Sequence, residues 1–266
     1  MSTRHIAIIS ILSIMLVAGC TSLPSRGLSL TLQADPSTVF SKSSTTLHID
    51  VDNQNTKSID NVVVELFDTG LLQGEKCSKF FPRLLPYEFQ TISCKLDAPH
   101  IDEASVQTEV NTRVSFDNEF SADQVFELMD ENEYQQRVAA GSYEAKPGNY
   151  VYSDKNIAIE IEFSEGLPLV IRPGKKYFVY FTITNSGDGF IGNINPRDFI
   201  VNNENILDCP PAVALSPVGK QFPRIACEIK APIDFLGGRG FRNSDFLMHL
   251  KYNYELRNML RINVIR

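Results

Sequence analysis

Five cysteines are the residues of this chain whose type and spacing could do chemistry, and they divide into one single residue and two pairs. Cys20 closes an N-terminal apolar run. Cys77 and Cys94 form one pair, and Cys209 and Cys227 form a second pair with nearly the same spacing. Thiols can form disulfides, bind zinc, act as nucleophiles or carry a lipid, so the surroundings of each cysteine decide among these chemistries.

Residues 1–19 have the pattern of a signal peptide: Arg4 and His5, an apolar stretch, then small residues. The apolar run is shorter than the roughly 20 residues that a spanning helix needs. Its ending, Val17-Ala-Gly-Cys20, resembles the lipobox of bacterial and archaeal lipoproteins, in which the cysteine becomes the lipidated N-terminus. We therefore expect lipid attachment at Cys20 and a short tether over residues 20–27. A signal peptide with an incidental cysteine is the alternative.

The remaining four cysteines favour two disulfides, Cys77–Cys94 and Cys209–Cys227. Exported proteins fold where disulfides persist, and an even number of thiols remains once Cys20 is set aside. Each bridge would contribute about 3 kcal/mol in the chain-entropy model. Crossed pairing between the pairs and free buried thiols are the alternatives. Zinc is disfavoured, because no close C-x(2–4)-C spacing exists.

No other residues are arranged for catalysis or metal binding. His48, His100 and His249 have no partner at metal or triad spacing, and each is expected at the surface. Asp50 and Asp52 share one face of a predicted strand, which is more typical of a solvated face than of a Ca²⁺ site. The sequence predicts no catalytic residue, no metal site and no cofactor.

The stretch 187–192 matches the G-x-G-x-x-G pattern of dinucleotide sites. Because Asn193-Ile-Asn-Pro196 follows it and cannot begin a helix cleanly, we predict a β-turn there.

Composition narrows the class of protein. The chain has 266 residues, is 43% apolar and carries a net charge of −7, from 25 Lys and Arg against 32 Asp and Glu. The apolar content suffices for a packed core. An acidic chain without basic clusters is a poor nucleic-acid binder, so no nucleic-acid partner is expected.

An internal repeat predicts the architecture, because the two cysteine pairs and several alternating apolar runs recur at almost the same offset. Such alternation indicates strands with one buried face. We expect an all-β fold with two tandem Ig-like β-sandwiches, at residues 28–120 and 151–266. The alternating runs begin at Leu28, Leu47, Val106, Ile157, Tyr177 and Leu250.

The segment between the two copies changes its pattern. Val125, Leu128 and Met129 have helical spacing, Ser121 could cap the N-terminus, and Gly141 could end a helix. We expect a short helical linker over residues 121–150, with a loose charged linker as the alternative.

The duplicated unit resembles the CARDB-type, adhesion-related Ig-like domains of archaeal and bacterial envelope proteins. The points of likeness are Arg172-Pro173-Gly174 before a strand, a strand running into Asn185-Ser-Gly187, and the last strand of each copy. The first copy departs from this pattern, with Asn53-Gln-Asn55 in place of Asn-Ser-Gly. The resemblance implies an extracellular, non-catalytic binding or spacer module without shared ligand residues.

These observations predict a lipid-anchored protein of the cell envelope with a structural, adhesive, or protein- or glycan-binding role and no catalysis. Its expected partners are the membrane, through the lipidated N-terminus, and other envelope proteins or surface glycans. An accessory ligand-binding lipoprotein of a transporter is the alternative, and it would need a cleft between the sandwiches. A secreted hydrolase is the weaker alternative.

Rows of aromatic residues, such as Tyr252 and Tyr254, could bind glycan but more often cover a neighbouring domain.

Overall fold

The computed structural model describes residues 27–266 except 75, 204–205, 211–212, 231–235 and 237. Cys20 and the predicted signal peptide lie outside the described residues. Almost all of the regular structure is β-strand, as the alternating apolar runs predict. The strands are β1 (Leu28–Asp35), β2 (Thr38–Phe40), β3 (Ser44–Asn53), β4 (Ile59–Asp68), β5 (Gln73–Gly74), β6 (Ser78–Leu84), β7 (Phe89–Asp97), β8 (Ser105–Asp130), β9 (Asn149–Ser153), β10 (Ile157–Phe163), β11 (Leu169–Ile171), β12 (Tyr177–Asn185), β13 (Phe190–Ile191), β14 (Phe199–Asn203), β15 (Leu207–Asp208), β16 (Ile225–Ile229) and β17 (Phe241–Ile265).

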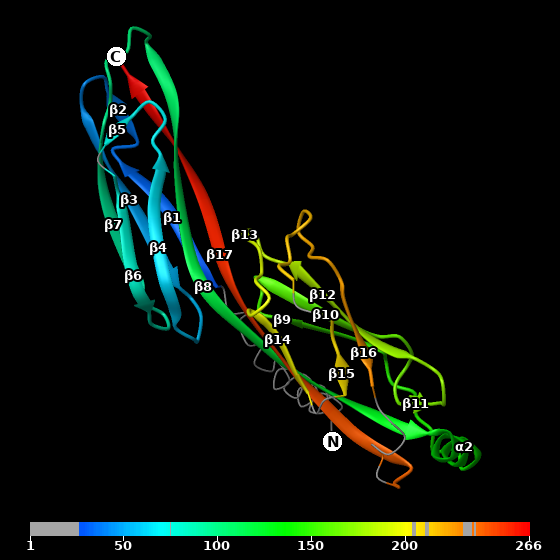
Figure 1. The fold of residues 1–266 in the computed structure, drawn as a ribbon. Coiled ribbons are helices and arrows are strands. Elements are labelled where there is room, and N and C mark those ends of the chain that lie inside the picture. Colours follow the sequence, from blue (N-terminus) through cyan, green and yellow to red (C-terminus); the bar gives the residue numbers. More distant parts are fainter. Residues whose placement is uncertain (1–26, 75, 204–205, 211–212, 231–235, 237) are drawn as a thin grey trace, which may run out of the picture.

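Three sheets build two lobes (Figure 1). A four-stranded sheet, β1-β3-β7-β5, packs on one half of an eight-stranded sheet and forms the first lobe with it. A five-stranded sheet, β15-β16-β12-β10-β9, packs on the other half and forms the second lobe. The eight-stranded sheet has the path β13-β17-β8-β4-β6, with β11 beside β8 and with β14 and β2 beside β17. The β-sandwich expected from the sequence is therefore present in each lobe.

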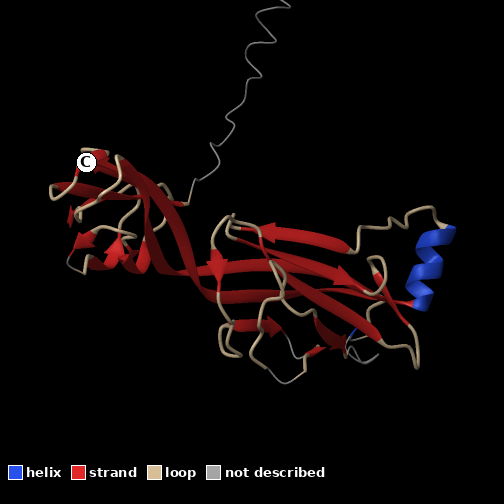
Figure 2. Cartoon of the chain, turned by 90° about the horizontal axis from the view of Figure 1, so that it is seen from above, coloured by secondary structure: helices blue, strands red, loops and turns tan. Residues whose placement is uncertain are grey.

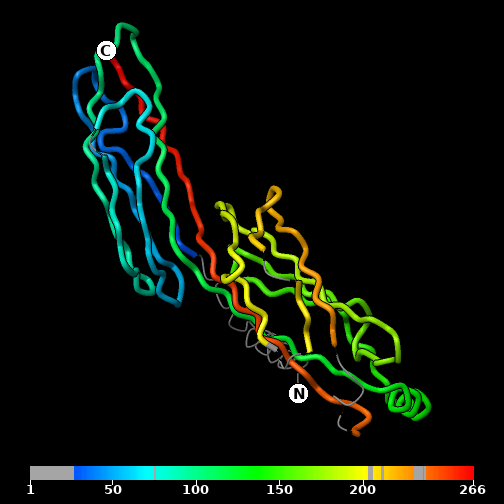
Figure 3. The backbone as a smooth tube through the Cα atoms, viewed as in Figure 1, coloured from blue at the N-terminus to red at the C-terminus, as the bar shows by residue number. Residues whose placement is uncertain are grey.

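Two long strands run through both lobes (Figure 3). β8 has 26 residues and β17 has 25, and they pair antiparallel along the whole length of β17. At about 3.3 Å per residue, a strand of this length spans roughly 85 Å. Val114 and Phe116 are buried in the first lobe and Phe126 and Leu128 in the second, so one face of β8 supplies both cores.

The two halves of the chain have matching topology. The order β1-β3-β7-β5 in the first lobe corresponds to β10-β12-β16-β15 in the second. The short strand β2 pairs parallel with β17, and its counterpart β11 pairs parallel with β8. Each half therefore contributes its last strand to both lobes. The matching strand order is that of two copies related by a two-fold axis near the middle of the ladder.

The boundaries expected at residues 120 and 151 do not separate the lobes. Asn263, Val264 and Ile265, at the end of the predicted second domain, pair with β2 in the first lobe. Residues 121–129, from the predicted linker, pair with β17 in the second lobe. The physical reason is that the ladder is continuous, so each half crosses into the other lobe.

The prediction of a helix from Ser121 is wrong for residues 121–130, which belong to β8. Phe120, Ala122, Phe126 and Leu128 continue the period-two burial of the strand, with Gln124 buried between them. Tertiary pairing with β17 outweighs the local helical spacing of these residues, as it commonly does for short segments.

A helix does follow, at α2 (Glu131–Ala139), which lies at the far end of the second lobe (Figure 2). Its N-cap is Asp130, whose carboxylate accepts a hydrogen bond from the Glu133 amide at 2.7 Å. Gly141, with φ of 65°, ends it as expected. The amides of Gly141 and Ser142 donate to the carbonyls of Val138 and Arg137, which is the Schellman pattern.

A buried asparagine ends β3 in the first copy and its counterpart β12 in the second. Asn53 donates to the carbonyls of Leu84 and Leu85, and its side-chain oxygen accepts from the Asn55 amide at 3.1 Å. Asn185 donates to the Gly189 carbonyl and accepts from the Gly187 amide. The first copy thus has the same turn chemistry as the second, although its sequence departs from Asn-Ser-Gly.

The Gly187–Gly189 turn wraps around Tyr254 of β17. The Gly189 amide donates to the Tyr254 hydroxyl at 2.7 Å, and the turn continues into β13 rather than into a helix. The dinucleotide interpretation of residues 187–192 is therefore excluded, as the following Asn-Ile-Asn-Pro predicts.

Replacing Gly189 by alanine is expected to lower the free energy of unfolding by about 1–3 kcal/mol, the usual cost of overpacking. A Cβ there would lie 2.4 Å from the Glu255 carbonyl oxygen and 2.6 Å from the Tyr254 ring. Gly192→Ala is the matched control, because its Cβ meets nothing within 4 Å. Urea unfolding of both variants measures the difference, and equal midpoints would contradict the packing described for this turn.

Candidate functional site

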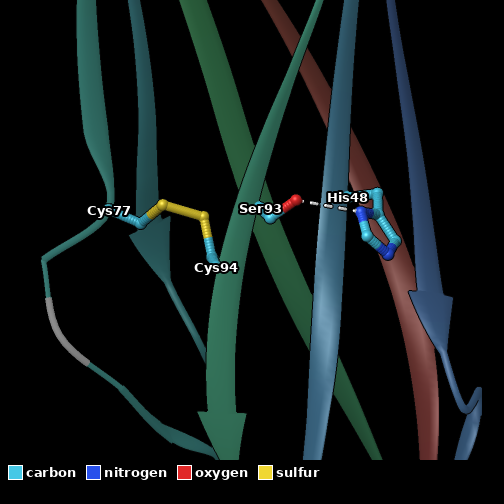
Figure 4. The surroundings of a disulfide bond; sticks show 4 residues. All are labelled: His48, Cys77, Ser93 and Cys94. Carbon is cyan, nitrogen blue, oxygen red and sulfur yellow. Dashed lines mark hydrogen bonds between the residues drawn. A yellow bond between two sulfur atoms is a disulfide. The ribbon is translucent and has the colours of Figure 1, made fainter.

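The two predicted disulfides are present. Cys77–Cys94 and Cys209–Cys227 have Cα–Cα distances of 6.0 and 4.1 Å. In each lobe the bridge joins a residue just beyond an edge strand, β5 or β15, to the neighbouring strand, β7 or β16. Figure 4 shows the first disulfide together with His48 and Ser93, whose side chains form a hydrogen bond between adjacent strands. The crossed-pairing and free-thiol alternatives do not apply to this structure. Both bridges fit an extracytoplasmic location.

The candidate binding site is a cavity of about 430 Å³ at the junction of the lobes, here called the waist cavity. Its floor is the middle of the β8–β17 ladder, and its walls come from the start of β4 and from the segment between β13 and β14. Its lining is almost entirely polar: Asp60, Asn61, Asp117, Asn118, Glu119, Asn193, Asn195, Asp198, Lys251, Tyr252 and Asn253.

Asp117 organises the floor of the waist cavity. One carboxylate oxygen accepts from Asn61 Nδ2 at 2.8 Å, and the other accepts from Asn253 Nδ2 at 3.1 Å. Asn61 reaches Asp117 because β4 has a bulge between Asp60 and Val63, with Asn61 at φ of 55°. Asparagine tolerates this left-handed conformation better than most residues, and bulges commonly redirect a side chain.

The charges of the waist cavity are predominantly negative. The Arg83 guanidinium, 2.6 Å from the Asp60 carboxylate, lowers the pKa of that carboxyl. The hydrogen bond from Lys251 likewise lowers the pKa of Glu119. These groups are therefore ionised at neutral pH. Amide and carboxylate groups in a wide, polar concavity suit a ligand rich in hydroxyl or amine donors.

Behind the floor lies a buried polar cluster. The Tyr252 hydroxyl donates to Asp154 Oδ2 at 2.5 Å, and Asn118 Nδ2 contacts both the Tyr252 hydroxyl and Asp154. Tyr252 is 5% exposed. Burial, followed by the Asp154 charge, raises its pKa well above the usual range. This cluster joins β8 and β17 to the turn between β9 and β10.

A second, apolar cavity of about 240 Å³ lies beside Cys209 in the second lobe. Phe199, Val201, Leu215 and Ile225 are among the residues that line it. It lies between the sheets of one lobe. Among its described lining residues the only charged side chain is that of Arg224, which pairs with Glu162.

The described histidines are half-buried or exposed. His48 bonds the Ser93 hydroxyl at 3.1 Å, His100 lies 3.3 Å from Asp102, and His249 lies 3.6 Å from Glu119. His249 lies beside the waist cavity, where its partner Glu119 also forms an ion pair with Lys251.

The carboxylates of Asp50 and Asp52 on β3 accept hydrogen bonds from neighbouring side chains. Thr91 donates to Asp50 at 2.7 Å and Gln54 donates to Asp52 at 2.8 Å. Within the described part of the chain, no group of three or more His, Cys, Asp or Glu side chains is arranged to hold a metal ion.

The aromatic rows have structural roles. Tyr252 and Tyr254 are buried at the junction of the lobes, where Tyr254 packs on Phe116 with ring centroids 5.7 Å apart. Phe178 and Tyr180 face outward from β12, and Arg224 lies 3.9 Å over the Tyr180 ring. Tyr252 and Tyr254 therefore pack inside the protein and do not form a solvent-exposed row.

The sequence does not predict the waist cavity, because its residues come from four separate segments. Only the bulge at Asp60-Asn61 leaves a local signal, as two polar residues interrupting an apolar strand. The pairing of β8 with β17 is needed to place the other residues.

Comparisons with known proteins identify no family: no family model matches, and no curated protein matches. Among solved structures, the collagen adhesin (CNA) of S. aureus matches at 11% identity over 92% of this chain and 94% of that chain, with a TM-score of 0.16. At that score the likeness supports no inference. Separately, none of the described helices has the length and apolar character to cross a membrane.

Replacing Tyr252 by phenylalanine is expected to lower the free energy of unfolding by about 1–3 kcal/mol, because Asp154 and Asn118 lose a buried partner. Because the folded-state pKa of Tyr252 is raised, the unfolded chain loses this proton first, and stability falls as pH rises above about 10. The variant lacks that component, so its stability should depend less on pH in that range.

Denaturant unfolding between neutral pH and pH above 10 measures both effects. Tyr87→Phe, at an exposed tyrosine, is the control and should leave stability and its pH dependence unchanged. A Tyr252→Phe variant as stable as the control would refute the role of the cluster.

Proposed function

We propose that this protein is a lipid-anchored protein of the cell envelope that acts as a rigid structural or adhesive module, without catalysis. The observation that carries this proposal is the continuous β8–β17 ladder. Two hydrogen-bonded strands connect the lobes, so the lobes keep a fixed relation that a single-chain linker would not maintain. A fixed, elongated body suits a protein that holds a binding surface at a set position near a membrane.

Export and anchoring are supported by separate features. The N-terminal apolar run ends in the lipobox-like Val17–Cys20, and the remaining cysteines are all bridged. The resemblance to CARDB-type Ig-like domains points in the same direction. The turn chemistry of Asn53 and Asn185, common to both copies, adds support to a duplicated unit of that kind.

The proposal includes no catalysis, because the sequence offers no nucleophile and base at the spacing of a known catalytic motif. The proposed partners are other envelope proteins or surface glycans, which crosslinking in native membranes would identify.

Replacing Cys20 by serine is expected to release the protein from membranes, because the lipid supplies the anchor. Membrane fractionation and the intact mass of the mature chain measure the change, with a fatty-acyl mass on the wild type and none on the variant. Thr21→Ser, which keeps the cysteine, should behave as the wild type. Membrane retention of Cys20→Ser equal to that of the wild type would contradict the anchor.

A second candidate function is favoured by the waist cavity. Its volume and polar lining suit an accessory lipoprotein that captures a polyhydroxylated ligand for a transporter. Asn193 and Asn195, on one wall, are exposed and offer amide groups to such a ligand.

Binding of the purified protein to an array of neutral oligosaccharides tests this candidate. Asn193→Ala with Asn195→Ala should weaken binding of a captured oligosaccharide about tenfold, the equivalent of one good hydrogen bond. Asn149→Ala, an exposed asparagine outside the cavity, should leave it unchanged. An array without any bound oligosaccharide would count against the candidate.

A further inference from the structure

The turn between β6 and β7, together with the first residue of β7, presents three large apolar side chains to solvent. Leu85, Tyr87 and Phe89 are 57%, 68% and 57% exposed, and they lie within five consecutive residues. Single exposed apolar residues are ordinary, but a cluster of this size on a loop commonly marks an interaction surface. We call these three residues the apolar tip.

The apolar tip is held in a fixed conformation. The Glu88 carboxylate accepts from the Leu85 amide at 2.6 Å and from Gln90 Nε2 at 2.7 Å, and the Glu88 amide donates to the Leu85 carbonyl. These bonds lower the pKa of Glu88. Tyr87 has φ of 60°, a conformation that glycine or asparagine adopts more easily. The turn therefore keeps a bulky side chain where backbone geometry favours a small one, which points to a role for that side chain.

The apolar tip lies beside the point where the chain enters the first lobe. Gly27 accepts a hydrogen bond from the Gln54 amide, and Asn53 donates from its own amide to the Glu88 carbonyl. Leu28 pairs with Asn53 on β3, whose neighbour is β7. Two strand spacings, about 10 Å, therefore separate the start of β1 from the tip.

The tether is short. Seven residues, Thr21–Gly27, separate Cys20 from Leu28, and even fully extended they reach at most about 25 Å. A lipid on Cys20 would hold this end of the first lobe against the bilayer. The neighbouring loop, residues 54–58, carries a single charged side chain, the ammonium of Lys57, which does not oppose contact with phospholipid head groups.

We propose that Leu85, Tyr87 and Phe89 insert into the membrane interface beside the lipid anchor and fix the orientation of the protein on the bilayer. The occupant of this surface is the lipid bilayer itself. Tyrosine and phenylalanine with a neighbouring leucine are the side chains that favour this interface. The inference rests on the proposed lipid anchoring, because the tether places the tip at the membrane.

The chain contains no tryptophan, so a single introduced tryptophan reports on its own position. Phe89→Trp places it at the apolar tip. Phe40→Trp is the matched control: Phe40 is 62% exposed and lies at the opposite end of the same lobe, beside the C-terminal Ile265. Both variants replace one exposed aromatic residue by another.

The mature lipidated variants are reconstituted in phosphatidylcholine vesicles, with or without brominated acyl chains. The tryptophan of Phe89→Trp should shift its emission to shorter wavelength, and brominated lipid should quench it several-fold more than that of Phe40→Trp. Equal and weak quenching in both variants would overturn the proposal. A shifted emission without bromine quenching would also overturn it, since the tip would then be covered by protein.

A second arm separates this proposal from the anchoring itself. Residues 1–20 are replaced by a histidine tag bound to nickel-chelating lipid, so that residues 21–27 remain the tether. If the native protein carried no fatty-acyl mass on Cys20, the lipid anchor would be refuted. The tagged protein would still show whether brominated lipid quenches the tryptophan of Phe89→Trp. Unquenched Phe89→Trp in both arms would refute the tip contact alone.

Discussion

The continuous ladder between β8 and β17 is the interaction on which the rest of the structure depends. Every residue of β17 pairs with β8, so the ladder is both the wall of the first core and the wall of the second. Neither lobe can lose this wall without exposing its apolar residues. We therefore expect the two lobes to be one cooperative unit, in contrast to tandem domains on a flexible linker.

Duplication explains why the ladder can serve both lobes equally. Two antiparallel strands are related by a two-fold axis, and each copy supplies one of them together with its own outer sheet. The correspondence extends to a defect: the buried hydroxyls of Thr112 and Ser244 have no hydrogen-bond partner. These two residues are separated by the same number of positions as Cys77 and Cys209. A matching cost in both copies, about 1–3 kcal/mol for each buried hydroxyl, is consistent with inheritance from one ancestral unit.

The sequence predicts the local features of this fold but not the crossing of its long strands, β8 and β17, from one lobe into the other. Alternation at Leu47, Ile49 and Val51, the spaced cysteines and the turn at Gly187 depend on near neighbours, and each of them is present in the structure. The extension of β8 past Phe120 depends on a strand more than a hundred residues away. Buried Gln124 also hides the alternation there, because its polarity is offset by the hydroxyl of Tyr152, which donates to its side-chain oxygen, and by the Val125 carbonyl, which accepts from its side-chain nitrogen. The waist cavity shares this dependence, so it could not be predicted either.

The proposed membrane contact of the apolar tip bears on what the waist cavity could bind. Asp60, on one wall of the cavity, pairs with Arg83, two residues before Leu85 of the apolar tip. Two residues of a strand span about 7 Å, so a tip on the bilayer would place this wall of the cavity close to the head groups. A ligand for the cavity would then come from the membrane surface more readily than from bulk solvent. With the proposed lipid anchor, lipid head groups, surface glycans and neighbouring envelope proteins would be the partners within reach of the cavity.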